Sequence, residues 1–136
     1  MAGTNPLILQ YQEQEINTMS RGELLIKLYD ELIKNLKYGA LLFGQNNPEA
    51  AKKCTTKCRD ILNYLIVILN GQYPISNQLR SIYSFMVGQI IQANVRNQAD
   101  YLEKILPMAQ ELRDAWVQAE KIVRMQNSGK GKERSN

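Results

Sequence analysis

Two cysteines are the first side chains of this sequence that could do chemistry. Cys54 and Cys58 are four residues apart, so both thiols would lie on one face of a helix, one turn from each other. Two thiolates could begin a zinc site, but the chain has no histidine and no third cysteine to complete it. We therefore interpret both cysteines as small buried residues in a reducing compartment, and we expect no metal and no cofactor.

Acidic side chains are the second candidates for chemistry, and they stand near basic residues. Glu23 precedes Lys27, and Asp30 precedes Lys34, by four residues, which is the favourable order for an ion pair on an exposed helix face. Without histidine the chain also lacks the most common general base. The sequence thus predicts no catalytic residues, and we expect a protein that is not an enzyme.

The net charge of +4 is concentrated at the end of the chain. Residues 1–120 hold equal numbers of basic and acidic residues, whereas residues 121–136 hold five basic residues against Glu133. A nucleic-acid partner would require a basic face on the folded part, so we expect no such partner. We interpret the basic end as a solvated tail. Weak attraction of Lys121–Arg134 to an anionic surface is the alternative.

The apolar runs of the chain are short. The longest aliphatic run, Leu65–Leu69, has five residues, whereas a helix needs about 20 apolar residues to cross a bilayer. The opening stretch Met1–Leu9 has neither the basic start nor the long apolar core of a signal peptide. The sequence therefore predicts a cytosolic protein without membrane insertion.

Apolar residues recur at spacings of three and four in four segments, which is the pattern of amphipathic helices. The first helix is expected at about Ser20–Phe43, where Ser20 opens a capping box. The second is expected to begin at Pro48 behind the cap residue Asn47 and to end at Asn70–Gly71.

The other two helices are expected at about Ser76–Arg96 and Gln98–Met125. Asn97 is expected to cap the start of the last helix. Pro107 lies inside the last helix and is expected to kink it, because proline removes one backbone hydrogen bond.

The connections between these helices are short, which favours antiparallel neighbours. We therefore predict an all-α fold, an antiparallel up-down-up-down four-helix bundle over residues 20–126. Residues 1–19 are expected to form a flexible N-terminal arm, and residues 127–136 a disordered basic C-terminal tail. The predicted core stripes include Ile91 in the third helix, continued by Asn94, and Val123 in the fourth.

The helices carry more apolar residues than one core-facing stripe needs. Leu24–Tyr29 holds five apolar residues in six positions, whereas about three positions in seven suffice for one buried face. The surplus has two interpretations. It is either a wider core or a seam between two copies of the chain, or it is a groove that receives an amphipathic helix of a partner protein.

A set of short motifs also runs through the chain in a fixed order. They are Tyr11, Ile16–Thr18, Leu24–Leu25, Leu28–Asp30, Ile82–Tyr83, Ala93–Asn94, Asp100 and Leu112–Trp116. Over Tyr11–Ala119 their order and spacing resemble the FliS family of flagellar export chaperones, which is specific for flagellin.

The resemblance implies a helical bundle in the bacterial cytosol that binds the disordered C-terminal segment of flagellin. It further implies that the bundle prevents premature polymerisation and delivers the segment to the flagellar type III export gate. A co-chaperone and a second copy of the chain are further candidate partners. Carried over from the family, Tyr11 and Ile16 would anchor the N-terminal arm over part of the groove when cargo is absent.

From these motifs and stripes we expect partner contacts in the groove or at the edge of the core. The candidate partner-binding residues are Tyr11, Ile16, Leu24, Leu25, Leu28, Tyr29, Ile82, Tyr83, Val87, Ile90 and Asn94. A homodimeric helical adaptor without flagellin binding is the alternative function.

Overall fold

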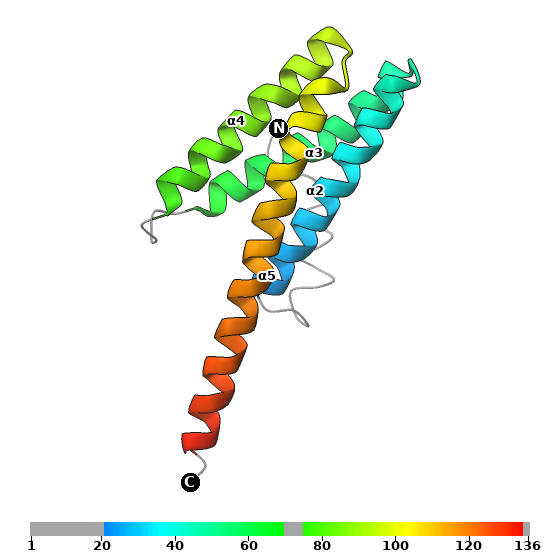
Figure 1. Cartoon of the computed structure of the whole chain (residues 1–136). Helices are drawn as coiled ribbons and strands as arrows, with labels where there is room; N and C mark the ends of the chain where they lie inside the picture. Colours follow the sequence, from blue (N-terminus) through cyan, green and yellow to red (C-terminus); the bar gives the residue numbers. More distant parts are fainter. Residues whose placement is uncertain (1–20, 70–74, 135–136) are drawn as a thin grey trace.

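A computed structural model of the chain describes residues 21–69 and 75–134, with side chains described as far as Gln126. Four helices follow one another: α2 (Arg21–Gly44), α3 (Pro48–Ile68), α4 (Ser76–Arg96) and α5 (Asp100–Arg134). The chain reverses direction at each connection, and the helices pack in a ring in which α5 returns to contact α2 (Figure 1). The prediction of an all-α up-down-up-down bundle is confirmed.

Several expectations concern residues outside the described ranges. They are the flexible arm over residues 1–19 with its anchors Tyr11 and Ile16, the capping role of Ser20, and the helix end at Asn70–Gly71. Within the described residues, α3 ends at Ile68. The bounds of α4 agree with the expected segment at both ends.

Asparagine residues form the turn from α2 to α3. Asn46 has a φ of 58°, in the left-handed region that asparagine tolerates better than most residues with a Cβ. The amide of Asn47 donates to the Leu42 carbonyl at 2.8 Å, which is the long bond of a Schellman motif. The side chain of Asn47 then accepts from the amide of Ala50, and Pro48 occupies the first turn of α3. The predicted cap at Asn47 is confirmed.

The turn from α4 to α5 differs from the prediction. Asn97 does not cap the start of the last helix, as expected, but ends α4 with a φ of 53°. The amide of Gln98 donates back to the Ala93 carbonyl at 3.2 Å, and α5 begins only at Asp100. The prediction for Asn97 was wrong because asparagine suits both a helix start and a left-handed helix end.

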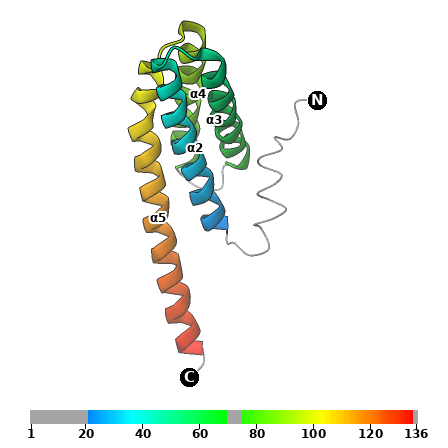
Figure 2. The same cartoon turned by 90° about the vertical axis from the view of Figure 1, so that its right-hand side faces the viewer.

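The last helix is longer than expected. α5 has 35 residues and runs past Met125 to Arg134, so residues 127–134 are helical and the prediction of a disordered tail there was wrong. Two glycines argued against helix in this stretch, since each costs about 1 kcal/mol relative to alanine. A helix that is already nucleated extends without a new nucleation step. α5 is continuous through the exposed Pro107 and projects beyond the other helices (Figure 2).

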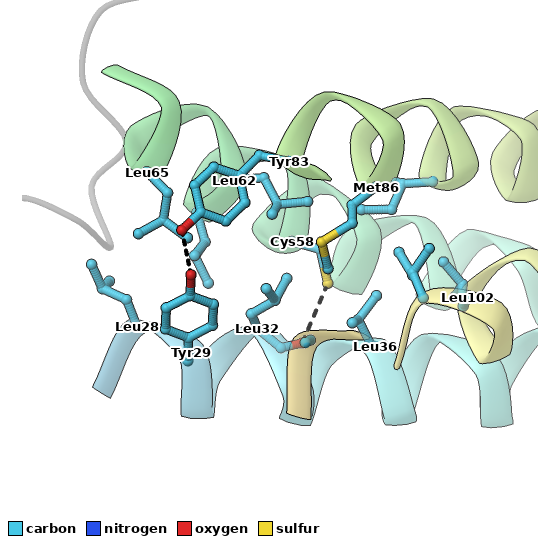
Figure 3. Close-up of a cluster of buried hydrophobic side chains, with 14 of the residues drawn as sticks. Leu28, Tyr29, Leu32, Leu36, Cys58, Leu62, Leu65, Tyr83, Met86 and Leu102 are labelled. Carbon is cyan, nitrogen blue, oxygen red and sulfur yellow. Dashed lines mark hydrogen bonds between the residues drawn. The ribbon is translucent and has the colours of Figure 1, made fainter. Parts of the chain in front are cut away.

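All four helices contribute to one core. Its largest fully buried side chains are Leu28, Tyr29, Leu32, Leu36, Ile61, Leu62, Leu65, Tyr83, Met86, Ile90 and Leu102 (Figure 3). Two residues that were expected on the core stripes are instead exposed, Ile91 by 41% and Val123 by 48%. Ile91 lies one position past the buried Ile90, and Val123 lies where α5 approaches the first residues of α2 and leaves the bundle.

Candidate partner-binding surface

The candidate residues divide into a buried and a partly buried set. The structure buries Leu24, Leu28, Tyr29, Tyr83 and Ile90 in the core. It leaves Leu25, Ile82, Val87 and Asn94 partly buried. The four helices enclose the buried residues. The partly buried residues therefore lie at the edge of the core. Partner contact by either set stays a prediction.

Tyr29 and Tyr83 meet through their hydroxyl groups across the interior, from α2 and α4 (Figure 3). The indole Nε1 of Trp116 on α5 donates to the Tyr29 hydroxyl at 3.2 Å. Burial raises the pKa of the Tyr29 hydroxyl well above its ordinary value, and burial also raises the pKa of Tyr83. Both hydroxyls therefore stay neutral at physiological pH, and they join three helices as hydrogen-bonding groups.

Two hydrogen bonds fix the seam between α3 and α4. The hydroxyl of Thr55 donates to the side-chain oxygen of Asn94 at 2.8 Å. Thr55 is fully buried, so this bond satisfies a polar group that has no access to water. Towards the other end of the seam, the guanidinium of Arg80 donates to the carbonyl of Leu69 at 2.8 Å. The flank of α4 that carries Arg80 and Asn94 therefore faces α3.

The two cysteines are free and differ in their surroundings. Cys58 is buried, and its thiol contacts the Leu32 carbonyl at 3.8 Å (Figure 3). Burial raises the pKa of the Cys58 thiol, which makes it a poor nucleophile. Cys54 is only partly buried. The interpretation as a buried small residue is thus confirmed for Cys58 and holds only in part for Cys54.

An ion pair joins α2 to α5. The guanidinium Nε of Arg113 lies 2.8 Å from a carboxylate oxygen of Asp30. This arrangement differs from the expected pair of Asp30 with Lys34. Lys34 instead contacts Glu31, at 3.3 Å. Asp30 is therefore part of a contact between helices, which the spacing within one helix did not indicate.

Large apolar side chains remain exposed on all four helices. They are Tyr38 and Leu41 on α2, Val67 on α3, Phe85, Ile91 and Val95 on α4, and Ile122, Val123 and Met125 on α5. Phe85 and Val95 were not among the partner-binding residues predicted from the sequence. The sequence does contain a signal for them, a second stripe at spacings of three and four. It lies away from the buried stripe of α4 and consists of Phe85, Gly88, Ile91 and Val95.

The described residues offer little for other kinds of site. Within residues 21–69 and 75–134, no three histidine, cysteine or acidic side chains gather where they could hold a metal ion. None of the helices in this part of the chain is long and apolar enough to cross a membrane. The exposed apolar side chains and the core edges are therefore the features that a partner could use.

The four helices and their motifs match a known protein family. The family model described as "Flagellar protein FliS" matches residues 4–123. The chain belongs to the FliS family. The resemblance seen in the motifs from Tyr11 to Ala119 is thereby confirmed, and the match extends beyond those motifs at both ends.

Curated relatives match this FliS family member over most of its length. It is 29% identical over 131 residues to the flagellar secretion chaperone FliS of Bacillus subtilis (strain 168), which covers 96% of the chain and 98% of the relative. It is 27% identical over 107 residues to the flagellar secretion chaperone FliS of Escherichia coli (strain K12), covering 76% and 79%. The FliS protein of Vibrio cholerae is similar to the same degree, at 27% over 108 residues.

Membership of the FliS family supports a role as a flagellar export chaperone. A chaperone works by binding another protein, which agrees with the prediction that the chain is not an enzyme. The candidate surface described above is therefore best considered as a surface for protein binding.

Proposed function

We propose that the chain binds the C-terminal segment of flagellin in the bacterial cytosol, prevents its premature polymerisation and delivers it to the flagellar type III export gate. The observation that carries this proposal is the FliS family match over residues 4–123. Two further relatives in other bacteria carry the same name of flagellar secretion chaperone.

The surface of the bundle supports this function. Leu25, Ile82 and Val87 are partly buried side chains packed against the core, so an apolar partner could complete their burial. A segment that is disordered when free folds as it binds, and the ordering offsets part of the contact energy. A large contact area then gives moderate affinity, which suits a chaperone that must release its cargo.

Calorimetric titration tests the binding step directly. The full chain is titrated with a synthetic peptide of the C-terminal segment of flagellin from the same organism. We expect a saturable interaction with 1:1 stoichiometry. A flat titration at roughly 50 μM, where a Kd in the micromolar range would be evident, would refute flagellin binding.

Delivery and protection need measurements of their own. Cells that lack the chain are expected to secrete less flagellin than cells that contain it, at equal flagellin synthesis. In solution, the added chain is expected to delay filament growth from flagellin monomers. Unchanged secretion in the deletion strain would argue against delivery to the export gate.

Self-association and a co-chaperone are the remaining partners to test. Exposed apolar side chains such as Val95 and Met125 would also suit a seam between two copies of the chain. Light scattering over a range of concentrations measures the mass of the free chain. A dimer that binds no flagellin peptide would favour the homodimeric adaptor. Affinity capture with the flagellin-bound chain tests for a co-chaperone.

A further inference from the structure

α4 has a second apolar face that no described residue covers. The flank with Arg80 and Asn94 faces α3 through the hydrogen bonds given above. Phe85 faces α5, because the ammonium of Lys104 lies 5.5 Å from the centre of its ring. Between these flanks, on the side away from the core, lies what we call the outer face of α4. Its residues are Ser81, Ser84, Gly88, Ile91, Gln92 and Val95.

The outer face carries no charge, and its apolar side chains lie in its C-terminal half. Val95 is 74% exposed and Ile91 is 41% exposed, and the other members are serine, glycine and glutamine. The face extends for about 20 Å at 1.5 Å per residue. Charged residues usually occupy the solvent side of a bundle helix. Their absence from this face favours contact with a partner over contact with water.

Gly88 lies near the middle of the outer face, and packing among the described residues does not require it. A Cβ at Gly88 would meet no described atom within 4 Å, although glycine in a helix interior costs about 1 kcal/mol relative to alanine. Gly39 is different, because a Cβ there would lie 3.0 Å from Leu102 Cδ1. Gly39 is explained by the approach of α5. Gly88 leaves room for a backbone that approaches from outside the chain.

The charges that α4 itself places beside the outer face are both basic. α4 contains no acidic residue, and its two charged residues, Arg80 and Arg96, lie eight positions to either side of Gly88. Lys104 adds a third positive charge on the α5 flank. A partner helix with acidic residues at both ends would complement these charges.

The same charges argue against a second copy of the chain at this face. If two α4 helices packed antiparallel about Gly88, Arg80 of one copy would lie level with Arg96 of the other. Neither helix has an acidic residue to offer in return. Like charges placed together across an interface oppose association, so the occupant is a different helix.

We propose that the outer face of α4 binds one amphipathic helix of the flagellin segment. That helix is about four turns long, with small and apolar residues at its centre and acidic residues at both ends. The inference rests on the proposed function and deepens it, because it names the face of the chaperone and the chemistry of the cargo helix.

Val95→Glu tests the face, and Val67→Glu is its matched control. Both valines are highly exposed, 74% and 77%, so neither change disturbs the core. We expect V95E to weaken binding of the synthetic flagellin peptide about tenfold, the equivalent of 1.4 kcal/mol. V67E, on the outer side of α3, is expected to stay within about twofold of the unchanged chain.

Gly88→Gln separates binding from folding. Because no described atom crowds Gly88 and glutamine is a better helix former, the variant is expected to melt at a higher temperature than the unchanged chain. The new side chain occupies the space of the partner backbone, so the peptide is expected to bind about tenfold more weakly. Gly44→Gln is the control, since a Cβ there also meets nothing within 4 Å.

The outcomes distinguish this inference from the proposed function. If V95E and G88Q both bind the peptide as tightly as the unchanged chain does, the outer face of α4 is not the binding face. Flagellin binding itself would still stand. No binding by the unchanged chain would overturn both. A peptide with its acidic residues replaced by their amides is expected to bind more weakly, and equal affinity would overturn the charge argument.

Discussion

The hydroxyl of Tyr29 on α2 contacts the hydroxyl of Tyr83 on α4, although 54 positions separate the two residues in the chain. α2 and α4 lie diagonally across the bundle, and each packs mainly against α3 and α5. Trp116 of α5 donates to the same Tyr29 hydroxyl. Tyr29 thus belongs to a buried polar cluster in which its hydroxyl contacts both Tyr83 and Trp116.

Removing the central hydroxyl should cost more than removing the outer one. Tyr29→Phe removes the hydroxyl that contacts both Tyr83 and the indole of Trp116, and we expect a loss of about 1–3 kcal/mol in the free energy of unfolding. Tyr83→Phe leaves the bond from Trp116 to Tyr29 in place, so we expect about 0.5–1.5 kcal/mol. Urea denaturation measures both values.

The double variant tests whether the three groups act together. Because Y29F already disrupts the contact that Y83F removes, the double variant should be nearly as stable as Y29F alone, within about 0.5 kcal/mol. Single losses that are equal and fully additive would contradict the central place of Tyr29.

Alkaline pH should destabilise the bundle through the same pair. Burial raises the pKa of both Tyr29 and Tyr83 above the ordinary value of 10.0. Below pH 10 the folded and unfolded states both keep these protons, so stability is unaffected. Above it the unfolded chain releases protons that the folded chain retains, and stability falls as the pH rises.

The absorbance of tyrosinate during a pH titration measures the ionisation of these two tyrosines. The chain has seven tyrosines, and we expect two of them to ionise only as the helices unfold. In the variant with both Tyr29→Phe and Tyr83→Phe, that late phase should disappear. A single phase for all tyrosines in the unchanged chain, with its helices intact, would count against the buried pair.

The periodic spacing of apolar residues was enough to predict four helices and their antiparallel order. It also identified Tyr29 and Tyr83 on their buried stripes. It could not predict that they touch, because contact across a bundle depends on the rotation and level of each helix. Asn97 shows a second limit, since asparagine serves at both kinds of helix boundary and only the backbone conformation decides between them.

The candidate surface was harder to predict than the fold. Ile90 and Ile91 have the same side chain, yet the structure buries the first and exposes the second. A helix turns by about 100° per residue, so neighbours in the chain point in different directions. The sequence signal for the outer face of α4 was the stretch between Arg80 and Arg96. This signal is the absence of charged residues, which is harder to notice than a pattern of residues that are present.

The two thiols should react at very different rates. Cys58 is buried, and its pKa is raised by burial, whereas Cys54 is partly exposed. Since the thiolate is the reactive form, a thiol reagent should modify one cysteine quickly and the second only upon unfolding. In Cys54→Ser the fast phase should vanish. A fast phase that persists in this variant would place the exposed thiol at Cys58.

The ion pair of Arg113 with Asp30 should contribute little to stability. Both side chains are partly open to solvent, with exposed fractions of 35% and 52%, and exposed pairs typically contribute under about 1 kcal/mol. Asp30→Asn should therefore lower the free energy of unfolding only slightly. The small difference should shrink further in high salt, because salt screens exposed charges. A large loss that persists in high salt would mean that Asp30 has a further role.

Gly39 lies where α2 approaches side chains of α5 and α3 closely. A Cβ built there would lie 3.0 Å from Leu102 Cδ1 and 3.6 Å from Thr55 Cγ2. We expect Gly39→Leu to lower the free energy of unfolding by about 1–3 kcal/mol, because the core must move apart to admit the side chain. Gly39→Ala should be nearly neutral, since the gain in helix propensity, about 1 kcal/mol, offsets the displacement of one leucine methyl.

Gly44→Leu is the control at an open site on the same helix. Thermal melts of the three variants should separate G39L from the other two, and a melting temperature of G39L equal to that of the unchanged chain would show that α2 and α5 are not in close contact at this level.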